Sequence, residues 1–503
     1  MKDIKIVIGG NFGDEGKGLM TDYFATEAVN EGRKTLVICS NGGAQRGHTV
    51  VTPKGIRHVF HHFGSGTLAG ADTWLPRFFI VNPMIFMNEY KELLAKGVRF
   101  AEPRMCEIAF ESKKTTGYDK IPEMNIKGIR IPGYEEGTKM SIKGIRIIMD
   151  PECPVTTPFD MITNQILEDS RGGNRHGSCG VGIWETLLRD GLFLGKMEKM
   201  SDSELYQYLD GRCRVQLIRR LDTFGIREIP EKWRDIIYSE DLLLNYIQDF
   251  REMCRIAEFC SVEVMKEYDR VIFEAGQGLL LDRLRKEYGC HTTPSNTGLR
   301  NPAEMIREYI SHIRGEKQGA AESELNDPSG NEPDMQGNEY NDPSRNPLSI
   351  TGNELSHSSV DYPGMQADDR KMDVEVCYVT RTYLTRHGAG PFKEECRKDE
   401  INPEMKDLTN VPNPHQGTLR YGKLDIDTFL RRIREDYDSE RFPEACNARM
   451  TWAVTHVNEY MPAGLKERKL DYSSDGETYF SVAKIGRKDG ESIPAKLRRK
   501  RTA

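Results

Sequence analysis

The chain has 503 residues, of which 37% are hydrophobic and 30% charged, and its formal net charge is −7. This length predicts either two or three lobes or one elaborated domain. The charge gives no general attraction to nucleic acid or to anionic membranes, and no run approaches the ~18 apolar residues of a membrane span, so we expect neither kind of partner. The 11 cysteines are scattered without a CxxC pair or zinc spacing, which predicts reduced thiols and a cytoplasmic location.

Strand and helix patterns alternate over the first hundred residues. Apolar runs predict strands, and helical spacing predicts helices, in the following ranges: strands at 5–10, 34–40, 48–52, 58–63 and 78–83, and helices at 18–32 and 83–97. This alternation is typical of the α/β class and predicts a largely parallel central sheet with loops at its strand ends.

The rest of the chain divides by composition. Residues 200–268 have helical apolar spacing and predict a helical subdomain, and 269–278 return to a strand and a glycine turn. Residues 314–372 repeat NDPS and GNE and hold few apolar residues, which predicts a disordered insertion. We therefore expect a single domain, made of residues 1–313 and 373–480, followed by a basic tail at 481–503.

A glycine loop follows the first predicted strand, in the stretch IGGNFGDEGKGLMTDYF at residues 8–24. Glycines let backbone N–H groups approach an anion, and the positive end of the next helix points to the same place. Lys17 can meet a phosphate there. An acid such as Asp14 beside a phosphoryl group is costly unless it holds Mg²⁺ or accepts a proton.

This loop is similar to a P-loop but does not match the Walker A pattern. Gly18 follows the Gly16–Lys17 pair where Ser or Thr is required, and Asn11 stands at the position of the first glycine. An ordinary P-loop ATPase is therefore a poor fit.

The stretch GDEGKG, with Asp22 after it, resembles the signature loop of adenylosuccinate synthetase, the ligase that joins aspartate to IMP with GTP. Further stretches resemble this family in its own order: NGGAQRGHTVV (41–51), ECPVTTPFDM, HGSCGVGI (176–183), VIFEAGQGLLLD (271–282), TTPSNTG (292–298) and YLTRHGAGPF (383–392). Two more, QGTLRYGKLD (416–425) and TWAVTHVNE (451–459), are similar to its aspartate loop and its guanine loop. The resemblance spans nearly the whole chain outside the insertion.

The resemblance implies a reaction in two steps. Asp14 would remove the N1 proton of IMP, so that O6 attacks the γ-phosphate of the donor, and the amine of aspartate would then displace phosphate at C6. Positioning and charge neutralisation dominate the catalysis of such phosphoryl transfer. His48 would bond the transferring phosphoryl group, and the Gly47 carbonyl would join Asp14 on Mg²⁺.

The resemblance also implies the other contacts. Catalytic roles fall on Asp14, Lys17, His48 and Gln277, of which Gln277 would touch the purine. Phosphate or nucleotide contacts fall on Gly13, Glu15, Gly16, Gly18, Gly47, Thr49 and Asn458. Substrate contacts fall on Gln45, Cys179, Thr293, Thr418 and Arg420. Arg189 is the candidate to reach the IMP phosphate of a second subunit, which implies a homodimer with shared sites.

Three departures leave alternatives open. Asn458 stands where the family has an aspartate, and a guanine donor left unpaired costs roughly 1–3 kcal/mol. Both ATP and GTP therefore stay open as the donor. Glu459 would take the place of that aspartate if the register shifts by one residue. QGTLRYG keeps one arginine, Arg420, while Arg431 and Arg432 lie outside the motif, so the amine substrate is open. Arg46, beside the histidine loop, either binds an extra anion or faces solvent.

Two other functions compete with an IMP–aspartate ligase. One is a related ligase that acts on dGMP or another purine monophosphate with ATP, although the retained Asp14 weighs against it. The other is a nucleotide-binding regulatory protein that has lost catalysis, which the altered aspartate loop favours and the retained Asp14, Lys17, His48 and Gln277 oppose.

Overall fold

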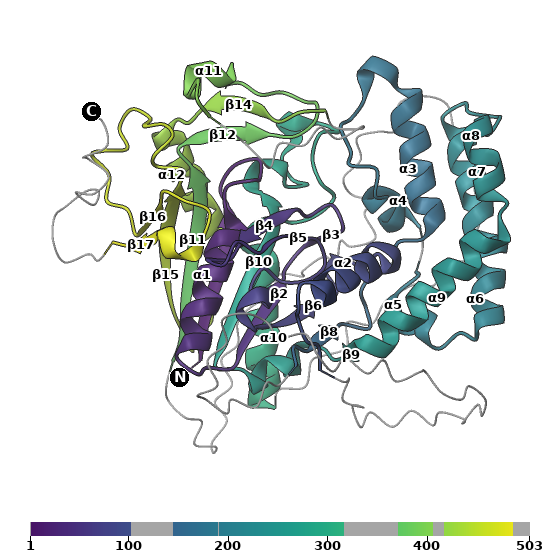
Figure 1. Cartoon of the computed structure of the whole chain (residues 1–503), viewed down its shortest axis with the longest axis horizontal. Coiled ribbons are helices and arrows are strands. Elements are labelled where there is room, and N and C mark those ends of the chain that lie inside the picture. Colours follow the sequence, from purple (N-terminus) through teal and green to yellow (C-terminus); the bar gives the residue numbers. More distant parts are fainter. Residues whose placement is uncertain (1, 102–143, 190, 316–370, 406–416, 486–503) are drawn as a thin grey trace, which may run out of the picture.

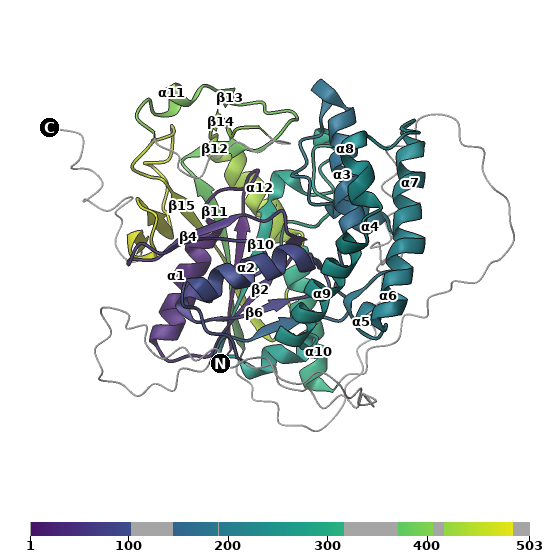
Figure 2. The same ribbon diagram turned by 45° about the vertical axis from the view of Figure 1, so that its right-hand side comes forward.

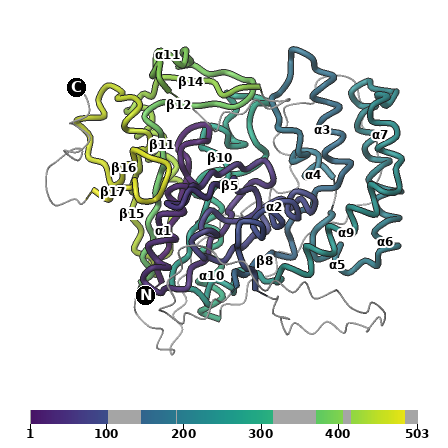
Figure 3. Tube along the Cα trace, viewed as in Figure 1, coloured from purple at the N-terminus to yellow at the C-terminus, as the bar shows by residue number. Residues whose placement is uncertain are grey.

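The computed structural model describes residues 2–101, 144–189, 191–315, 371–405 and 417–485 (Figures 1 and 3). Nearly all of the predicted insertion at 314–372, and the basic tail beyond residue 485, lie outside these ranges. Within them, no helix is both long and apolar enough to cross a bilayer.

The centre of the molecule is a ten-stranded sheet (Figure 1). Its strands in chain order are β1 Asp3–Gly9, β2 Thr35–Cys39, β6 Asp72–Leu75, β8 Ile147–Met149, β9 Glu258–Phe259, β10 Arg270–Gly278, β11 Met372–Arg381, β15 Cys446–Thr455, β16 Tyr472–Ser474 and β17 Val482–Lys484. Their spatial order is β17-β16-β15-β11-β1-β10-β2-β6-β8-β9. Every neighbouring pair is parallel except β16 and β17. The predicted α/β fold with a largely parallel sheet is confirmed.

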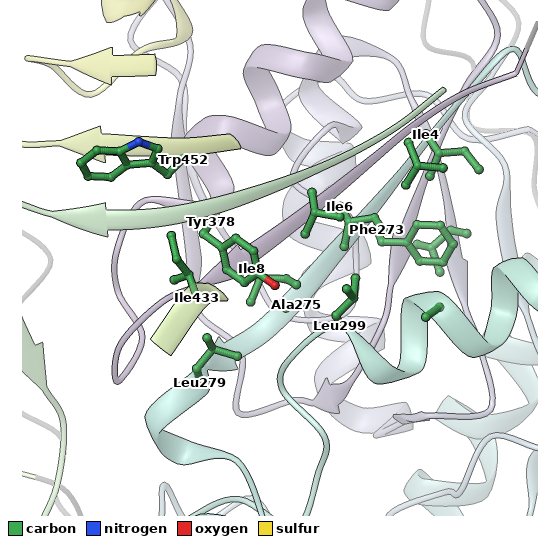
Figure 4. Packing of buried hydrophobic residues seen from close by; sticks show 14 of the residues in the cluster. Ile4, Ile6, Ile8, Phe273, Ala275, Leu279, Leu299, Tyr378, Ile433 and Trp452 are labelled. Carbon is green, nitrogen blue, oxygen red and sulfur yellow. The ribbon is translucent and has the colours of Figure 1, made fainter. Parts of the chain in front are cut away.

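Helices cover both faces of this sheet. They are α1 Lys17–Asn30, α2 Pro83–Ala95, α3 Pro158–Ser170, α4 Ile183–Leu188, α5 Leu194–Glu198, α6 Asp202–Tyr208, α7 Arg214–Thr223, α8 Glu231–Ile237, α9 Glu240–Ile256, α10 Arg300–Arg314, α11 Lys398–Ile401 and α12 Ile426–Asp438. Side chains alternate along β1, so Ile4, Ile6 and Ile8 pack with α10 and α12 on one face (Figure 4), while Val7 packs with α1 on the other.

A helical subdomain stands beside the sheet, and both views show α6, α7 and α9 together on the side away from α1 (Figures 1 and 2). It has its own buried cluster, which the helices share with β6 and β8. The predicted helical region at 200–268 is confirmed in part. A π-helical turn, Leu209–Cys213, separates α6 from α7 at Gly211, a poor helix former.

The helical region also ends earlier than predicted. Helix α9 stops at Ile256, and the next residues form β9 at the sheet edge. The cause is tertiary: Glu258 forms a buried ion pair with Arg146, with 2.6 Å between Oε2 and Nη2. That contact draws the chain out of the helix and onto β8.

Among the residues that the structure describes, three small sheets accompany the large one. They are a hairpin of β4 His48–Val51 and β5 Arg57–Phe60, a pair of β3 Gly42–Gly43 and β7 Phe79–Ile80, and a three-stranded sheet of β12 Tyr383–Arg386, β14 Arg420–Lys423 and β13 Glu395–Cys396.

The carboxyl ends of five consecutive parallel strands lie along one edge of the large sheet. These strands are β15, β11, β1, β10 and β2. Because parallel strands bring their carboxyl ends and following loops to the same edge, the glycine loop, the 41–48 segment, the end of β10 with Gln277 and the loop after β15 converge there. This edge is the candidate site.

Candidate active site

The glycine loop makes a tight path between β1 and α1. Gly13 and Gly16 have φ angles of 110° and 95°, and Gly16 is the N-cap of α1. Asp14 between them has φ 62°, which is uncommon for a residue with a Cβ. Such backbone strain persists only where surrounding contacts hold it, and it is frequent at functional sites.

The loop's anion-binding donors hold a carboxylate of the chain itself. Glu15 Oε1 accepts the backbone N–H groups of Asn11 and Gly13 at 2.9 and 2.8 Å, and Glu15 Oε2 lies 2.9 Å from Lys17 Nζ. Both side chains of this ion pair are 2% exposed. The donors expected to meet phosphate are therefore engaged by Glu15, and a phosphate group that reaches them has to displace it.

Asp14 is held by an arginine that the sequence reasoning missed. Arg381, the last residue of β11, donates from Nη2 to Asp14 Oδ2 at 2.6 Å and from Nε to the Asp14 carbonyl oxygen. The Asp14 side chain remains 27% exposed, so it is still accessible to a ligand. Arg381 lies two residues before the YLTRHGAGPF stretch, and that position was its one signal in the sequence.

His48 belongs to a buried cluster centred on Glu274 of β10. Glu274 accepts from Arg46 Nη2 at 2.7 Å and from the backbone N–H of Ser65 at 3.1 Å, and it lies 2.8 Å from His48 Nδ1. Burial alone would raise the pKa of Glu274, but the charges of His48 and Arg46 hold it well below its usual value. The other ring nitrogen of His48 lies 3.2 Å from the Gly276 carbonyl oxygen.

At this cluster the structure overturns one expectation, for Arg46, while the predicted phosphoryl contact of His48 stays a prediction. Arg46 is 1% exposed and bound to Glu274, so the alternative in which it faces solvent is wrong. The reason is that Glu274, buried on β10, needs a counter-charge that the sequence pattern did not reveal. His48 directs both ring nitrogens toward protein oxygens, and burial lowers its pKa despite the nearby carboxylate.

The amides of Gln277 and Gln45 have unpaired atoms. Gln277 Oε1 accepts from Asn41 Nδ2 at 3.1 Å, but Gln277 Nε2 and both amide atoms of Gln45 are buried without a partner in the described ranges. Unpaired buried amides of this kind cost about 1–3 kcal/mol and mark a position where a polar ligand or water supplies the missing bond. Both residues were predicted to contact the purine substrate.

Residues 455–459, which begin at the last residue of β15, form the donor-base loop, named after the guanine loop that this stretch resembles. Thr455 Oγ1 donates to the Glu15 carbonyl oxygen at 2.9 Å, which brings this loop against the glycine loop. Asn458 is exposed. The Glu459 carboxylate is already engaged, because it accepts the Tyr383 hydroxyl at 2.7 Å and lies 2.9 Å from His456 Nδ1.

The stretch that resembles an aspartate loop has its arginine engaged. Arg420 Nε donates to Glu395 Oε1 at 2.8 Å, and its Nη1 donates to the carbonyl oxygen of Gly390 at 2.9 Å. Thr418 is exposed. Neither residue is brought to the glycine loop by any contact among the described residues.

Two other arginines lie close to the glycine loop. Arg432 of α12 donates to the Gly10 carbonyl at 2.8 Å and to Asn11 Oδ1 at 2.6 Å. Arg386 of β12 is 1% exposed and lies over the Phe12 ring, 4.5 Å from its centroid. Burial lowers the pKa of each to about 10, and neither forms an ion pair with a carboxylate of the described chain.

Arg189 lies inside its own protomer. It is 6% exposed, its Nη2 is 3.0 Å from Asp160 Oδ2, and the same nitrogen donates to the Val155 carbonyl at 2.6 Å. In the described structure, burial and Asp160 hold the guanidinium in the interior between α3 and α4, and the predicted reach into a second subunit stays a prediction.

The remaining predicted contacts fall on two adjoining segments. His291 Nδ1 lies 3.0 Å from the His176 carbonyl oxygen, which brings the 176–183 stretch beside the 291–298 stretch. Cys179 and Thr293, in these stretches, are half-buried. Burial raises the pKa of the Cys179 thiol to about 11, so the thiol is neutral near pH 7.

Comparison with known proteins agrees with this reading of the fold. Residues 6–114 match the family model described as adenylosuccinate synthetase. Adenylosuccinate synthetase from Alkaliphilus metalliredigens is 24% identical over 284 residues, which are 55% of this chain and 52% of that protein. The Neisseria gonorrhoeae enzyme is 27% identical over 290 residues, again 55% and 52%. The chain thus spans about half the length of the curated relatives it matches.

Solved structures share the fold. The fully ligated adenylosuccinate synthetase from Plasmodium falciparum aligns with a TM-score of 0.54 and 14% identity, over 96% of this chain and 100% of the other. Cyanophage S-2L succinoaminodeoxyadenylate synthetase bound to dGMP and dATP aligns with a TM-score of 0.47 and 11% identity, over 96% of this chain and 95% of the other.

The fold and the converging loops define an α/β protein with a nucleotide-type glycine loop at the carboxyl edge of its sheet. Together with the matches, they make this chain similar to the adenylosuccinate synthetases, at low sequence identity.

Proposed function

We propose that this protein is a purine-nucleotide ligase of the adenylosuccinate synthetase type, forming a C–N bond at C6 of a purine monophosphate. The observation that carries the proposal is the convergence at one sheet edge of an accessible Asp14 and the unpaired amides of Gln45 and Gln277. These are the groups that the reaction needs: a base for the purine N1 proton and polar contacts for the purine ring.

In the first step Asp14 accepts the N1 proton of IMP, and O6 of IMP attacks the γ-phosphorus of the donor triphosphate. The bond from that phosphorus to the β,γ-bridging oxygen breaks and the nucleoside diphosphate leaves. In the second step the amine of L-aspartate attacks C6, and the O6-phosphate departs as inorganic phosphate. Phosphorylation is needed because a lactam oxygen is a poor leaving group.

The residues present fit a magnesium ion that is held jointly with phosphates. Mg²⁺ prefers oxygen ligands and is commonly bound by one or two carboxylates plus substrate phosphates. Among the residues that the structure describes, no group of three His, Cys, Asp or Glu side chains is placed to hold a metal alone. Asp14 and the carbonyl of the exposed Gly47 would hold the ion, which would neutralise charge on the transferring group.

Two features bear on the choice of donor and amine. Glu459 is engaged by Tyr383 and His456, which leaves Asn458 as the exposed side chain of the donor-base loop. Arg420 is engaged by Glu395, whereas Arg432 lies at the glycine loop without a carboxylate partner among the described residues. We propose that the donor is GTP or ATP and that L-aspartate is held by arginines other than Arg420.

The test is phosphate release by the purified protein with Mg²⁺, with GTP and ATP crossed against IMP, dGMP and GMP, each with and without L-aspartate. We expect aspartate-dependent release with IMP and a product of the mass of adenylosuccinate. If phosphate is released with dGMP but not with IMP, dGMP is the substrate in place of IMP. If no combination releases phosphate, the proposal is overturned. Asp14→Asn is the control, since it should bind IMP but release no phosphate.

A homodimer and a cytoplasmic location are further proposals, the first resting on the resemblance and the second on the cysteine pattern. Light scattering of the purified chain, and fractionation of cells that express it, test them directly.

A further inference from the structure

A continuous chain of hydrogen bonds joins Asp14 to the donor-base loop. Arg381 Nη2 is 2.6 Å from Asp14 Oδ2, and Arg381 Nη1 donates to the Tyr383 hydroxyl oxygen at 3.0 Å. The Tyr383 hydroxyl donates to Glu459 Oε2 at 2.7 Å, and Glu459 Oε1 lies 2.9 Å from His456 Nδ1. The side chains of Asp14, Arg381, Tyr383, Glu459 and His456 thus form one connected network, in which each contacts the next.

The middle of this network is buried and its two ends are accessible. Arg381 and Tyr383 are 5% and 1% exposed, whereas the side chains of Asp14, His456 and Glu459 are 27%, 31% and 25% exposed. A ligand can therefore reach either end. The connection between the ends is shielded from water, and this burial strengthens its hydrogen bonds.

The geometry of Arg381 makes the connection stiff. Its planar guanidinium holds the carbonyl oxygen and the carboxylate of Asp14 and the hydroxyl of Tyr383 at the same time, so one nitrogen cannot move without moving the others.

The donor-base loop is tied to the same strand end. Thr382 Oγ1 donates to the His456 carbonyl oxygen at 3.0 Å, and His456 itself has φ 57°. A displacement of this loop therefore acts on Glu459, then on Tyr383 and Arg381. Burial works to raise the pKa of Glu459, but its hydrogen bond from His456 and the His456 charge bring it below the usual value, so the carboxylate stays a charged acceptor.

We propose that Arg381 is a positioning residue for Asp14, and that Tyr383 and Glu459 couple the position of Asp14 to the occupant of the donor-base loop. A nucleotide base seated on that loop then holds Asp14 where it meets the purine monophosphate. The inference rests on the proposed function, which makes Asp14 the base and residues 455–459 the base-recognition loop.

The first test is structural and needs no ligand. In a crystal structure of Tyr383→Phe we expect the Arg381 guanidinium to rotate and its contact with Asp14 Oδ2 to lengthen beyond the 3.5 Å range of a hydrogen bond. Glu459→Ala is the second variant and should give the same change, because it removes the acceptor of the Tyr383 hydroxyl. Tyr472→Phe is the matched control, because it removes a buried tyrosine–glutamate bond of 2.6 Å, to Glu375, outside the network. An Asp14–Arg381 contact that is unchanged in both variants overturns the proposal.

The second test measures coupling between the two sites. Calorimetry of IMP binding is done with and without a non-hydrolysable GTP or ATP analogue. In the wild type we expect the analogue to tighten IMP binding by about 5-fold or more. In Tyr383→Phe that factor should fall to about one, while Tyr472→Phe keeps it. A factor that is retained in Tyr383→Phe, or absent from a wild type that binds both ligands, overturns the coupling.

Two further results distinguish a positioning role of Arg381 from a purely structural one, and failure of this inference from failure of the proposed function. We expect Tyr383→Phe to lower kcat with little change in the donor KM, and Arg381→Lys not to restore what Arg381→Met loses, because an ammonium cannot hold three oxygens in the guanidinium geometry. If Arg381→Lys restores turnover fully, a positive charge suffices and the positioning role is wrong. If the wild type binds no IMP, the proposed function fails while the crystal test still decides the inference.

Discussion

The buried ion pair of Glu15 and Lys17 stabilises the glycine loop at the place where the resemblance predicts phosphate binding. Each group is 2% exposed, and each depends on the other for its charge, because an unpaired buried charge is costly. The loop therefore keeps an internal anion where the resemblance places a phosphate.

We predict that Lys17→Met destabilises the fold. It leaves the Glu15 carboxylate buried with only two backbone N–H partners, so the free energy of unfolding should fall by about 1–3 kcal/mol. Urea denaturation followed by circular dichroism measures it. The control is Lys423→Met, which breaks a surface pair with Glu400 and should leave the midpoint unchanged. An equal midpoint in both variants would contradict the buried-pair interpretation.

Asp22 predicts a pH dependence of stability. Burial and the charge of Glu274 raise its pKa to about 7, while an unfolded aspartate has a pKa of about 3.9. Between about pH 4 and pH 7 the folded chain holds a proton here that the unfolded chain has released. The free energy of unfolding therefore falls as the pH rises through this window, by at most about 1.4 kcal/mol per pH unit.

Asp22→Asn removes this group, so we expect the variant to gain stability relative to the wild type as the pH rises from 4 to 7. Denaturation midpoints of the two proteins, taken across that range, give the difference directly. Parallel curves would mean that Asp22 does not hold a proton in the folded state.

At the level of residues, the sequence indicated the groups on the glycine and histidine loops but not the groups that hold them. Asp14 and Lys17 stand in one short motif, so their proximity could be predicted. Arg381 and Glu274 come from strands far along the chain. Glu274 lies inside the VIFEAGQGLLLD stretch and Arg381 lies just before YLTRHGAGPF, but neither stretch shows which loop residue each side chain contacts. The orientation of the Arg46 side chain could not be predicted for the same reason, because its partner Glu274 is 228 residues away.

Among the secondary-structure elements, α3 and α4 are joined by the ion pair of Asp160 and Arg189. Asp160 also forms the capping box of α3 with Thr157, so this one carboxylate serves both a helix start and a buried arginine. We predict that Arg189→Met lowers the free energy of unfolding by about 3–5 kcal/mol, because it leaves Asp160 buried without its counter-ion.

Thermal and urea denaturation of Arg189→Met test this prediction. Mixing the variant with Asp14→Asn adds a second readout. An arginine that served a partner subunit would let mixed dimers regain activity with no change in stability, and that outcome would contradict the assignment of Arg189 to its own interior.

The elements that could be predicted are those whose pattern is local. The period of apolar residues and the glycines located β1, α1, β2 and α2 close to their observed bounds. The end of α9 could not be predicted, because the residues after it still carry helical spacing, while the pairing of β9 with β8 and the contact of Glu258 with Arg146 hold them at the sheet.

For the whole molecule, we predict that replacing residues 318–370 by a short Gly/Ser linker leaves the cooperative melt and the activity intact. The flanking elements are complete without the replaced segment. Gly315 caps α10 with N–H bonds to His312 and Ser311, and Met372 N bonds to the Ala445 carbonyl oxygen at 2.8 Å at the start of β11. Differential scanning calorimetry and phosphate release measure the result. A lost or broadened transition would show that the segment is structural.

The pairing of β1 with β11 has a consequence for how the protein is made. Asp14 and Arg381 are 367 residues apart in sequence, so their contact requires nearly the whole sheet to have been synthesised. At about 5–20 residues per second, a ribosome needs on the order of tens of seconds to cover that interval. Throughout this time the nascent chain carries the complete signature loop but not the arginine that holds its aspartate. A chain that stops before β11 would keep the sequence by which the family is recognised and lack the arginine that holds Asp14 in place.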